Sequence, residues 1–507
     1  MKKNKKKIII ISLVVILIIA VAVAIFLFMT MNNKEEKEIK TKPEEKKSAY
    51  RISGNELQDF DLYFLQLENE KVNKLYSPLS IKYALEMLKE GAKENSKSQI
   101  ENIIGDYEAK TYPNNEHMSF ANAMFIQNAY KDAIKEEYTN TLKSKYNAEI
   151  IYDSFENVDN LNTWVSNKTF NLINDLFDNV SGQSFILVNA LAIDMEWEKP
   201  IQATAKNYRD MYSVNYAHEN FNAYISPIDG DNYSSVKFND NIEAKAVEIG
   251  AAINNYDIVN DLGEENIRKT VGAEYEKWLK EGGCGNDLDT ATYLDNYIKE
   301  LDSNYKKVDS STDFLFYDDE NIKAFAKDLK EYDNTTLQYV GIMPKKESLD
   351  SYIKETNAKE INTVINNLKE IKSENFKEGV VTKITGFIPL FKFDYELKLM
   401  EDLKQLGITD VFNINKSNLS GIAKNGPVAI NKVTHKANIE FSNEGIKAAA
   451  ATQMGGLGSA SCEFEYLYDV PVETIDLTFD NPYLFLIRDK NTGEVWFTGT
   501  VYNPTTK

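Results

Sequence analysis

A run of small residues near the C-terminus limits most strongly what this chain can fold into. Residues 440–470 read EFSNEGIKAAAATQMGGLGSASCEFEYLYDV, and Ala448–Ala451 show neither helical nor strand periodicity. Four consecutive alanines favour a helix, which a Gly/Ser-rich loop would follow. Small side chains on both faces also let a segment enter a crowded sheet at little steric cost. The residues therefore predict either an exposed helix and linker or a loop that becomes a central strand in another state.

The composition is that of a globular chain with a large core. The chain has 507 residues, of which 43% are apolar and 27% charged, and it is longer than an average single domain. Its two cysteines, Cys284 and Cys462, exclude a small disulfide-stapled fold and are too few for a four-ligand zinc site without help. The formal net charge of −20 disfavours general binding to nucleic acid. No nucleic-acid partner is therefore expected.

The N-terminus carries the only long apolar run. Residues 1–7 are rich in lysine, residues 8–31 are uncharged and apolar, and residues 32–48 form a charged linker. An apolar run of this length is enough to span a bilayer as a helix, and the preceding lysines favour a cytoplasmic N-terminus. We therefore expect a single-pass signal anchor in the cell membrane, with the chain after it outside the cytoplasm. A cleaved signal peptide, followed by secretion, is the alternative.

Sequence motifs of the common enzyme classes are absent. The chain has no HExxH metal motif, no GxxxxGKS/T phosphate loop, no GxGxxG after a strand and no GxSxG nucleophile turn. It has only three histidines, His117, His218 and His435. The sequence therefore predicts a protein that is not an enzyme and has no metal or cofactor site.

Helical and strand patterns alternate from about Ala49 onward. Ser77-Pro78 is a helix start, with a serine N-cap and a proline at the first helical position. The continuous apolar run at 185–193 is typical of a strand that is buried on both faces. Two β-rich runs at 483–487 and 495–501 flank an Asn-Thr-Gly turn and predict a hairpin. Residues 260–307 contain two acidic amphipathic helical stretches.

Seven blocks of the sequence, taken in order, resemble the serpin family. They cover most of 50–507: YSPLSIKYALEMLKEGAK (76–93), WVSNKTFNLINDLF (164–177), LVNALAIDMEWEKPI (187–201), FIPLFKFDYELKLMEDLKQLGITDVF (387–412), VTHKANIEF (433–441), NEGIKAAAAT (443–452) and FDNPYLFLIRDKNTGEVWFTGTVYNP (479–504). The resemblance implies an α+β serpin fold over 49–507, with three β-sheets, about nine helices and an exposed reactive-centre loop at about 445–478. An insertion atypical of the family is expected within about 202–310.

The resemblance also implies a mechanism and a set of site residues. A serpin inhibitor is cleaved in its loop by a serine protease, or in some cases a cysteine protease, and the loop then inserts into the main sheet and distorts the trapped protease. The hinge positions implied here are Glu444, Gly445, Ile446, Ala448, Ala449, Ala450, Ala451 and Thr452. The polar "shutter" beneath the opening sheet is implied at Ser77, Ser80, Asn189 and His435. The "breach", where insertion begins, is implied at Trp197.

The family pattern places the scissile bond at Ser459-Ala460, in a register made uncertain by the long loop. Small residues there favour elastase-like or subtilisin-like targets, whereas Leu457 favours a chymotrypsin-like one. No Arg or Lys lies between Lys447 and Arg488, so a trypsin-like target is not expected. The protein is expected to act as a monomer.

Three departures from the family pattern leave a second function open. Asn443 stands where a Glu is usual, Ile446 stands where a small Thr or Ser is usual, and the loop is longer than in typical members. A bulky Ile446 could slow insertion or simply pack well. The alternative to an inhibitor is therefore a serpin-fold surface protein that binds partners without inhibiting a protease.

The two cysteines fall in the two unusual segments. Cys284 lies in the middle segment and Cys462 lies just past the expected cleavage point. Outside the cytoplasm they could form a disulfide that ties the middle segment to the far side of the loop, and two free thiols are the alternative.

Overall fold

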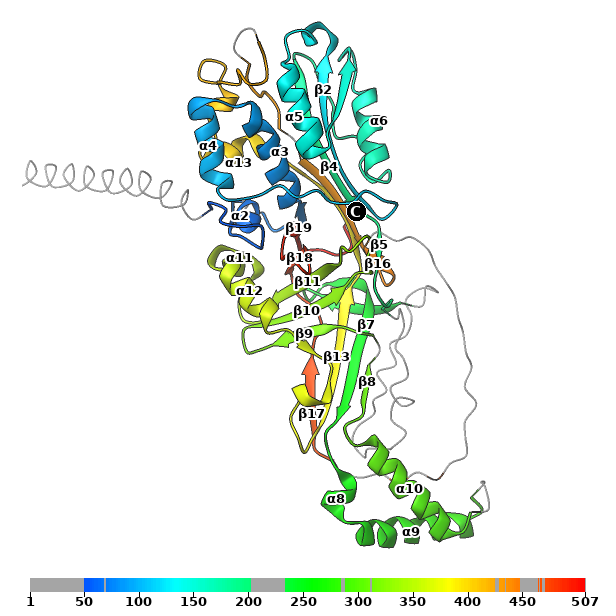
Figure 1. Cartoon of the computed structure of the whole chain (residues 1–507). Helices are drawn as coiled ribbons and strands as arrows, with labels where there is room; N and C mark the ends of the chain where they lie inside the picture. Colours follow the sequence, from blue (N-terminus) through cyan, green and yellow to red (C-terminus); the bar gives the residue numbers. More distant parts are fainter. Residues whose placement is uncertain are drawn as a thin grey trace, which may run out of the picture.

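The fold was analysed in a computed structural model. The structure describes residues 50–506, except 68–69, 202–232, 284–287, 311, 425–427, 434, 447–463, 465 and 467–469. Within these residues, eleven α-helices and four β-sheets form an elongated α+β molecule (Figure 1). The predicted fold class is confirmed.

A seven-stranded antiparallel sheet forms the middle of the molecule. Its order is β1 (Lys74–Tyr76), β19 (Val495–Val501), β18 (Tyr483–Asp489), β11 (Leu337–Pro344), β10 (Ile322–Asp328), β9 (Leu315–Asp318) and β12 (Lys369–Glu370). The pair β18 and β19 is the predicted C-terminal hairpin. Every residue of β11 and β19 is buried, as expected for apolar strands in the interior of a sheet that is covered on both faces.

The expected large central sheet is divided into two parts. One part is β3 (Glu149–Asp153), β2 (Met118–Gln127) and β4 (Phe185–Ile193); the other is β14 (Phe391–Leu397), β15 (His435–Phe441), β16 (Gly445–Ile446) and β5 (Met195–Glu196). Because β5 follows β4 directly in the chain, the two parts meet at β5 and separate along β4. This division explains why four sheets appear where three were predicted.

The fourth sheet contains β17, the strand through which the chain returns from the loop region to the core. It consists of β17 (Val472–Asp476), β13 (Val381–Pro389), β7 (Ile242–Asn254) and β6 (Ser234–Phe238), with β8 (Val308–Ser310) paired to β7. The pairing of β17 with β13 is parallel, from Val381 opposite Val472 to Thr385 opposite Asp476. This pairing fixes the C-terminal end of the loop region.

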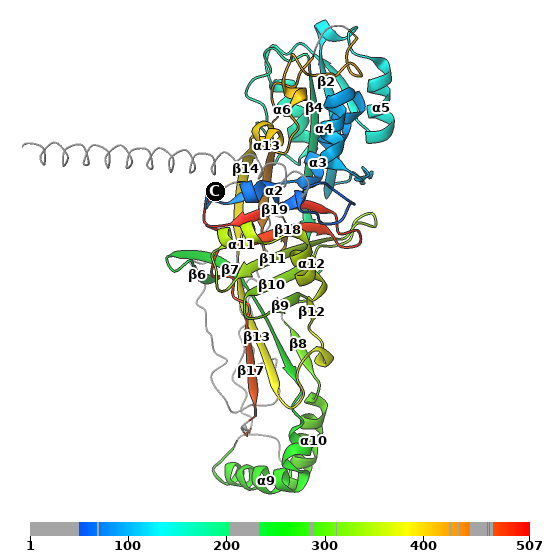
Figure 2. The ribbon, with the colours of Figure 1, turned by 90° about the vertical axis from the view of Figure 1, so that its left-hand side faces the viewer.

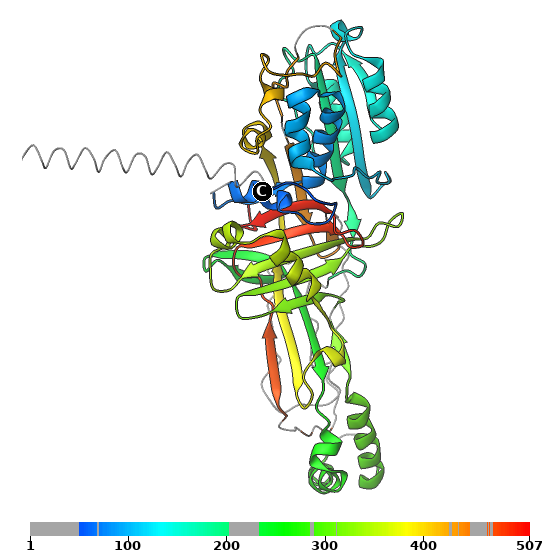
Figure 3. The ribbon, with the colours of Figure 1, turned by 60° about the vertical axis from the view of Figure 1, so that its left-hand side comes forward.

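Helices cover the two ends of the molecule. One end and the middle hold α2 (Phe60–Leu67), α3 (Pro78–Gly91), α4 (Glu94–Ile104), α5 (Glu136–Tyr146), α6 (Asp159–Lys168), α11 (Leu349–Glu355), α12 (Ala358–Asn366) and α13 (Leu399–Gln405). The opposite end holds α8 (Ile258–Leu262), α9 (Glu264–Lys280) and α10 (Thr290–Asn304), as Figures 2 and 3 show. The two acidic helical stretches predicted in the middle segment are thus α9 and α10.

The predicted start of α3 is confirmed by its cap. The Ser77 hydroxyl oxygen accepts a hydrogen bond of 3.0 Å from the backbone N–H of Ser80, and Pro78 is the first helical residue. The helix packs against β4 and β19. Its first turn therefore lies under the line along which the central sheet is divided.

The membrane localisation expected from the sequence needs correction. Among the described residues, no helix is long enough and apolar enough to cross a bilayer. The run at 8–31, the lysine-rich start and the linker to residue 48 lie outside the described residues. The prediction of a single-pass membrane protein is therefore withdrawn.

Candidate functional site

The expected hinge of the loop is a tight turn between β15 and β16. Phe441 pairs with Ile446 across the turn, and the N–H of Ser442 donates to the carbonyl of Gly445 at 3.0 Å. The Ser442 hydroxyl donates to the same carbonyl and accepts from the N–H groups of Glu444 and Gly445. The side chain of Ser442 therefore fixes the turn from inside, a role that the sequence analysis missed.

Gly445 is required by a close backbone approach. It lies opposite Glu196 in the pairing of β16 with β5, and a Cβ at this position would lie 2.1 Å from the carbonyl oxygen of Met195. No side chain fits at that distance. The glycine thus lets the first two residues of the loop region join the central sheet as β16.

Ile446 is already packed in the main core. It is 2% exposed, lies opposite Met195 of β5, and pairs with Phe441 of β15. Ile446 is therefore well packed in this state of the molecule, and its effect on the rate of insertion stays open.

Trp197, the predicted breach residue, holds the hinge turn from the opposite side. Its indole N–H donates to the carbonyl of Ser442 at 2.9 Å, and its backbone N–H donates to the carbonyl of Glu444 at 2.8 Å. The ring is 1% exposed and packs edge-on against Phe441. The Asn443 side chain accepts a hydrogen bond of 3.0 Å from the hydroxyl of Tyr233. A neutral hydrogen bond is therefore present where the family pattern has a charged residue.

The four predicted shutter residues are brought together at the other end of the divided sheet. The backbone N–H of Ser77 donates to Nε2 of His435 at 2.9 Å, and the Ser80 hydroxyl donates to Oδ1 of Asn189. The Asn189 amide donates in turn to Oδ1 of Asn122 at 2.7 Å. Asn122 was missed by the sequence analysis, although an asparagine in the middle of the mostly apolar strand 118–127 was a usable signal.

His435 is neutral in the folded protein at ordinary pH. Desolvation lowers its pKa to about 4 from the usual 6.5, because a buried imidazolium loses its hydration. The hydrogen bond from Ser77 also needs an unprotonated Nε2 as acceptor. Folding stability from this site is thus complete above about pH 6.5 and is lost progressively as the pH falls toward 4.

The pH dependence of this site can be measured with a His435→Gln variant, whose side-chain oxygen accepts the Ser77 hydrogen bond at every pH. From pH 7 to 4.5, the wild type should lose up to about 3 kcal/mol more resistance to unfolding than the variant. Unfolding rates in denaturant are the suitable measure, because a kinetically trapped fold makes equilibrium midpoints misleading. Parallel pH profiles for the two proteins would contradict the assignment.

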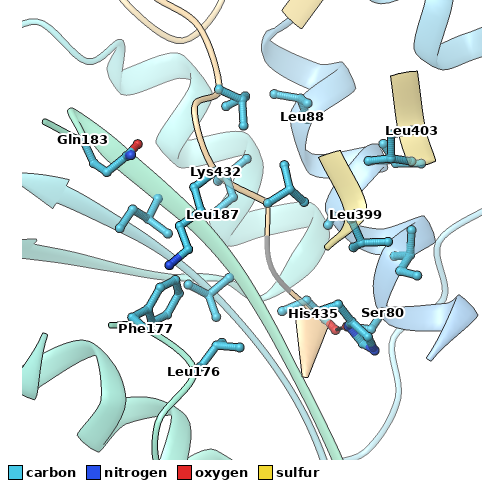
Figure 4. Close-up of a pocket in the computed structure, with 18 of the residues that line it drawn as sticks. Ser80, Leu88, Leu176, Phe177, Gln183, Leu187, Leu399, Leu403, Lys432 and His435 are labelled. Carbon is cyan, nitrogen blue, oxygen red and sulfur yellow. Dashed lines mark hydrogen bonds between the residues drawn. The ribbon is translucent and has the colours of Figure 1, made fainter. Parts of the chain in front are cut away.

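A partly open cavity of about 120 Å³ lies where the two halves of the central sheet separate. Figure 4 shows Ser80 and His435 at one end of it, with the Leu187 side chain of β4 and Leu399 and Leu403 of α13 along its sides. In the described residues, β4 pairs only with β2, and β15 pairs with β14 and, at Phe441 alone, with β16. Two unpaired strand edges therefore face one gap.

Two ion pairs link the segment before β4 to the other side of the gap, one to Lys432 shortly before β15 and one to Lys436 within it. The Lys432 ammonium lies 3.2 Å from the Asp178 carboxylate, and the Lys436 ammonium lies 2.7 Å from that of Asp175. Both carboxylates are exposed, and the lysine beside Asp178 lowers its pKa. These pairs tie the two halves of the sheet together at the solvent side.

The remaining predicted positions are not described. Ala448, Ala449, Ala450, Ala451, Thr452, Leu457, Ser459, Ala460, Cys284 and Cys462 all lie outside the described residues. The described residues therefore include the expected hinge up to Ile446 and the expected shutter and breach positions, whose roles stay predictions.

A divided central sheet, with a hinge strand already seated between its halves, defines a serpin-type fold. The family model described as "Serpin (serine protease inhibitor)" matches residues 58–218 and 308–504. The chain belongs to the serpin family, whose members generally act as inhibitors rather than as catalysts. Residues 219–307 are left unmatched.

The similar proteins are distant in sequence. An uncharacterized serpin-like protein of Methanosarcina mazei is 23% identical over 489 residues, covering 89% of this chain and 87% of the relative. The crystal structure of the thermophilic serpin tengpin in the native state has a TM-score of 0.56 at 20% identity, covering 89% of this chain and 97% of tengpin. Thyroxine-binding globulin in complex with thyroxine has a TM-score of 0.57 at 17% identity, covering 88% and 97%.

Proposed function

We propose that this chain inhibits a serine protease by inserting its cleaved loop between β4 and β15. The observation that carries the proposal is the hinge: β16 already pairs with β5 and with β15, directly above the two unpaired edges. An incoming strand would satisfy both edges with ladder hydrogen bonds. Ten such bonds at about 1 kcal/mol each would contribute on the order of 10 kcal/mol.

The pairing of β16 supports one register for the proposed inserted strand. Ile446 lies opposite Met195 on one side and Phe441 on the other, both in antiparallel pairs. Continued along both strands, this register places Thr452 between Asn189 and His435. The proposed strand therefore brings a hydroxyl to the shutter, where Asn189 and His435 offer hydrogen-bonding groups.

The same register decides which loop side chains face the core. Leu191 and Ile193 of β4 and Ala437 and Ile439 of β15 belong to the main core. The positions between them are Ala448 and Ala450, because side chains alternate along a strand. Small residues thus fall where the gap would have least room, which supports insertion as the role of the alanine run.

The test of this function is incubation of residues 49–507 with a panel of proteases. An elastase-like, subtilisin-like or chymotrypsin-like member should give an SDS-stable complex at the summed mass, and cleaved protein should gain heat resistance. A trypsin-like protease should not be trapped. Cleavage without a complex across the panel, and without gain in heat resistance, would contradict the proposal and favour the binding alternative. The cleavage site found by mass spectrometry tests the expected Ser459-Ala460 bond.

We also propose that Cys284 and Cys462 form a disulfide. Phe464, two residues after Cys462, lies with its ring centroid 5.8 Å from that of Trp278, six residues before Cys284. The flanking residues of the two cysteines are thus neighbours in space, which supports the pairing. Peptide mapping under non-reducing conditions should recover one cross-linked peptide pair. Recovery of both cysteines in alkylated form from protein denatured without reductant would exclude it.

A further inference from the structure

The helices α9 and α10 form an antiparallel hairpin at one end of the molecule, and that hairpin contacts residues 464–470, in the part of the loop region that precedes β17. The hairpin lies at the end opposite to β4, with β5 and β16 between them (Figure 1). It belongs to residues 219–307, which the family model does not match. Its contacts are therefore a property of this chain rather than of the family pattern.

The first contact is an aromatic cluster around Phe464. The Phe464 ring lies 5.3 Å from Tyr275, 5.8 Å from Trp278 and 5.8 Å from Tyr293, measured between ring centroids. Tyr275 of α9 and Tyr293 of α10 are stacked 3.8 Å apart, so both helices contribute to one aromatic site. A ring held by three others is anchored by burial and by edge-to-face attraction.

The second contact is an apolar cluster a few residues further along. Val470 is 5% exposed and belongs to one buried cluster with Ile267, Val271 and Leu294 of the hairpin and Val381 of β13. Tyr466 packs against the same cluster. The described residues just before β17 are thus fixed to the hairpin at Phe464, Tyr466 and Val470.

We propose that the α9–α10 hairpin clamps the C-terminal flank of the loop and makes insertion conditional on cleavage. This inference rests on the proposed function, since it concerns when the loop inserts. It assigns to the hairpin the role of holding the uncut protein in its insertion-competent state.

The chain length between the hinge and the clamp supplies the reason. In the proposed register, residues 447–456 run alongside β4 down to Phe185, which leaves 457–463 to return to Phe464. Seven residues span at most about 25 Å. The nine residues of β4 alone extend about 30 Å, and the hairpin lies beyond the hinge in the opposite direction. An uncut loop therefore cannot insert fully while Phe464 stays docked.

Without the clamp, the long loop has much more slack. Residues 457–471 would then connect the inserted strand to β17, and fifteen residues span up to about 54 Å, compared with about 25 Å for the seven residues before Phe464. The pairing of Val472 with Val381 remains as a second restraint, so full insertion of an uncut loop also requires β17 to leave β13. Cleavage at any bond between the inserted segment and Phe464 removes the restraint at once, because the inserting half of the loop is then no longer joined to the clamp. The clamp thus blocks self-insertion and leaves cleavage-triggered insertion free.

The experiment compares uncut wild type with Trp278→Ala, Phe464→Ala and the double variant. Each protein is incubated without protease, and the fraction that becomes heat resistant while its loop remains intact is followed over time. Leu279→Ala is the matched control, because Leu279 lies on α9 next to Trp278 but is exposed. Each single variant should convert about tenfold faster or more than wild type, given the energy of aromatic contacts. The double variant should add little to either single variant, since both remove one contact.

Equal conversion rates in wild type, control and all three variants would overturn the clamp. The Phe464 variant keeps the test valid if Trp278→Ala disturbs the helices. Failure of the proposed function is separate: wild type cleaved in the loop would then gain no heat resistance, whatever the uncut variants do. Conversion in the Leu279→Ala control equal to that in the two aromatic variants would also count against the clamp.

Discussion

An Ala450→Arg chain is expected to be cleaved by the target protease at the wild-type rate and to release it intact. The proposed register places residue 450 between Leu191 and Ala437, which are 7% and 3% exposed in the main core. An arginine there would bury an unpaired charge, which costs several kcal/mol. Complex formation should therefore fall at least about 100-fold, because cleavage no longer leads to insertion.

Ala449→Arg is the matched control for this experiment. Residue 449 falls on the opposite face of the proposed strand, which it shares with Lys447, a residue that is charged in the natural sequence. This variant should keep much more inhibitory activity than Ala450→Arg. Complex formation should be measured on SDS gels, and heat resistance after cleavage should be measured by thermal unfolding. Equal trapping by the two variants would disprove the register.

Replacing Gly445 by valine should expel the hinge strand from the central sheet. A Cβ at this position would lie 2.1 Å from the oxygen of Met195 and 2.8 Å from Cα of Glu196, and neither backbone atom can move cheaply. Hydrogen exchange at residues 195–197 and 441–446 should accelerate about 100-fold or more, since the pairing of β16 with β5 is lost. Trapping of the target protease should fall with it.

Asn443→Ala is the control within the same turn. Its side chain accepts one hydrogen bond from Tyr233, and its loss should cost about 1 kcal/mol while β16 stays paired. Exchange in the two peptides should then rise only a few-fold. If hydrogen exchange in Gly445→Val were as slow as in Asn443→Ala, the close approach of residue 445 to the Met195 backbone would not be what keeps β16 paired.

The sequence predicted the structure well at positions where the local residue types alone determine the conformation. The Ser77-Pro78 cap and the strand at 185–193 lie in the structure where they were predicted, because local chemistry decides each of them, although three residues of that strand are only partly buried. The shutter residues were predicted from the resemblance; the structure brings them together through hydrogen bonds, and their role stays a prediction. Asn122 completes this network from a third strand and carried no motif of its own.

Features that depend on distant contacts were not accessible from the sequence. The division of the central sheet follows from which strands fail to pair, and no local pattern records an absent pair. The role of Ile446 needed its neighbours Met195 and Phe441 to be known. Phe464 looked like any apolar residue after a Gly/Ser segment, since its partners Trp278 and Tyr293 lie nearly two hundred residues earlier in the chain.

The ion pairs across the gap imply that the rate of the proposed loop insertion depends on ionic strength. We expect Lys432 with Asp178 and Lys436 with Asp175 to separate when the proposed strand enters between the halves of the sheet. Exposed pairs of this kind contribute up to about 1 kcal/mol each and are weakened by dissolved salt. Under the proposed function, insertion should therefore be slower in dilute buffer than in concentrated salt, which would give the protease that cleaves the loop more time to complete hydrolysis and dissociate. The proposed outcome thus depends on the rate of insertion relative to the rate of hydrolysis, and salt raises the first of these rates.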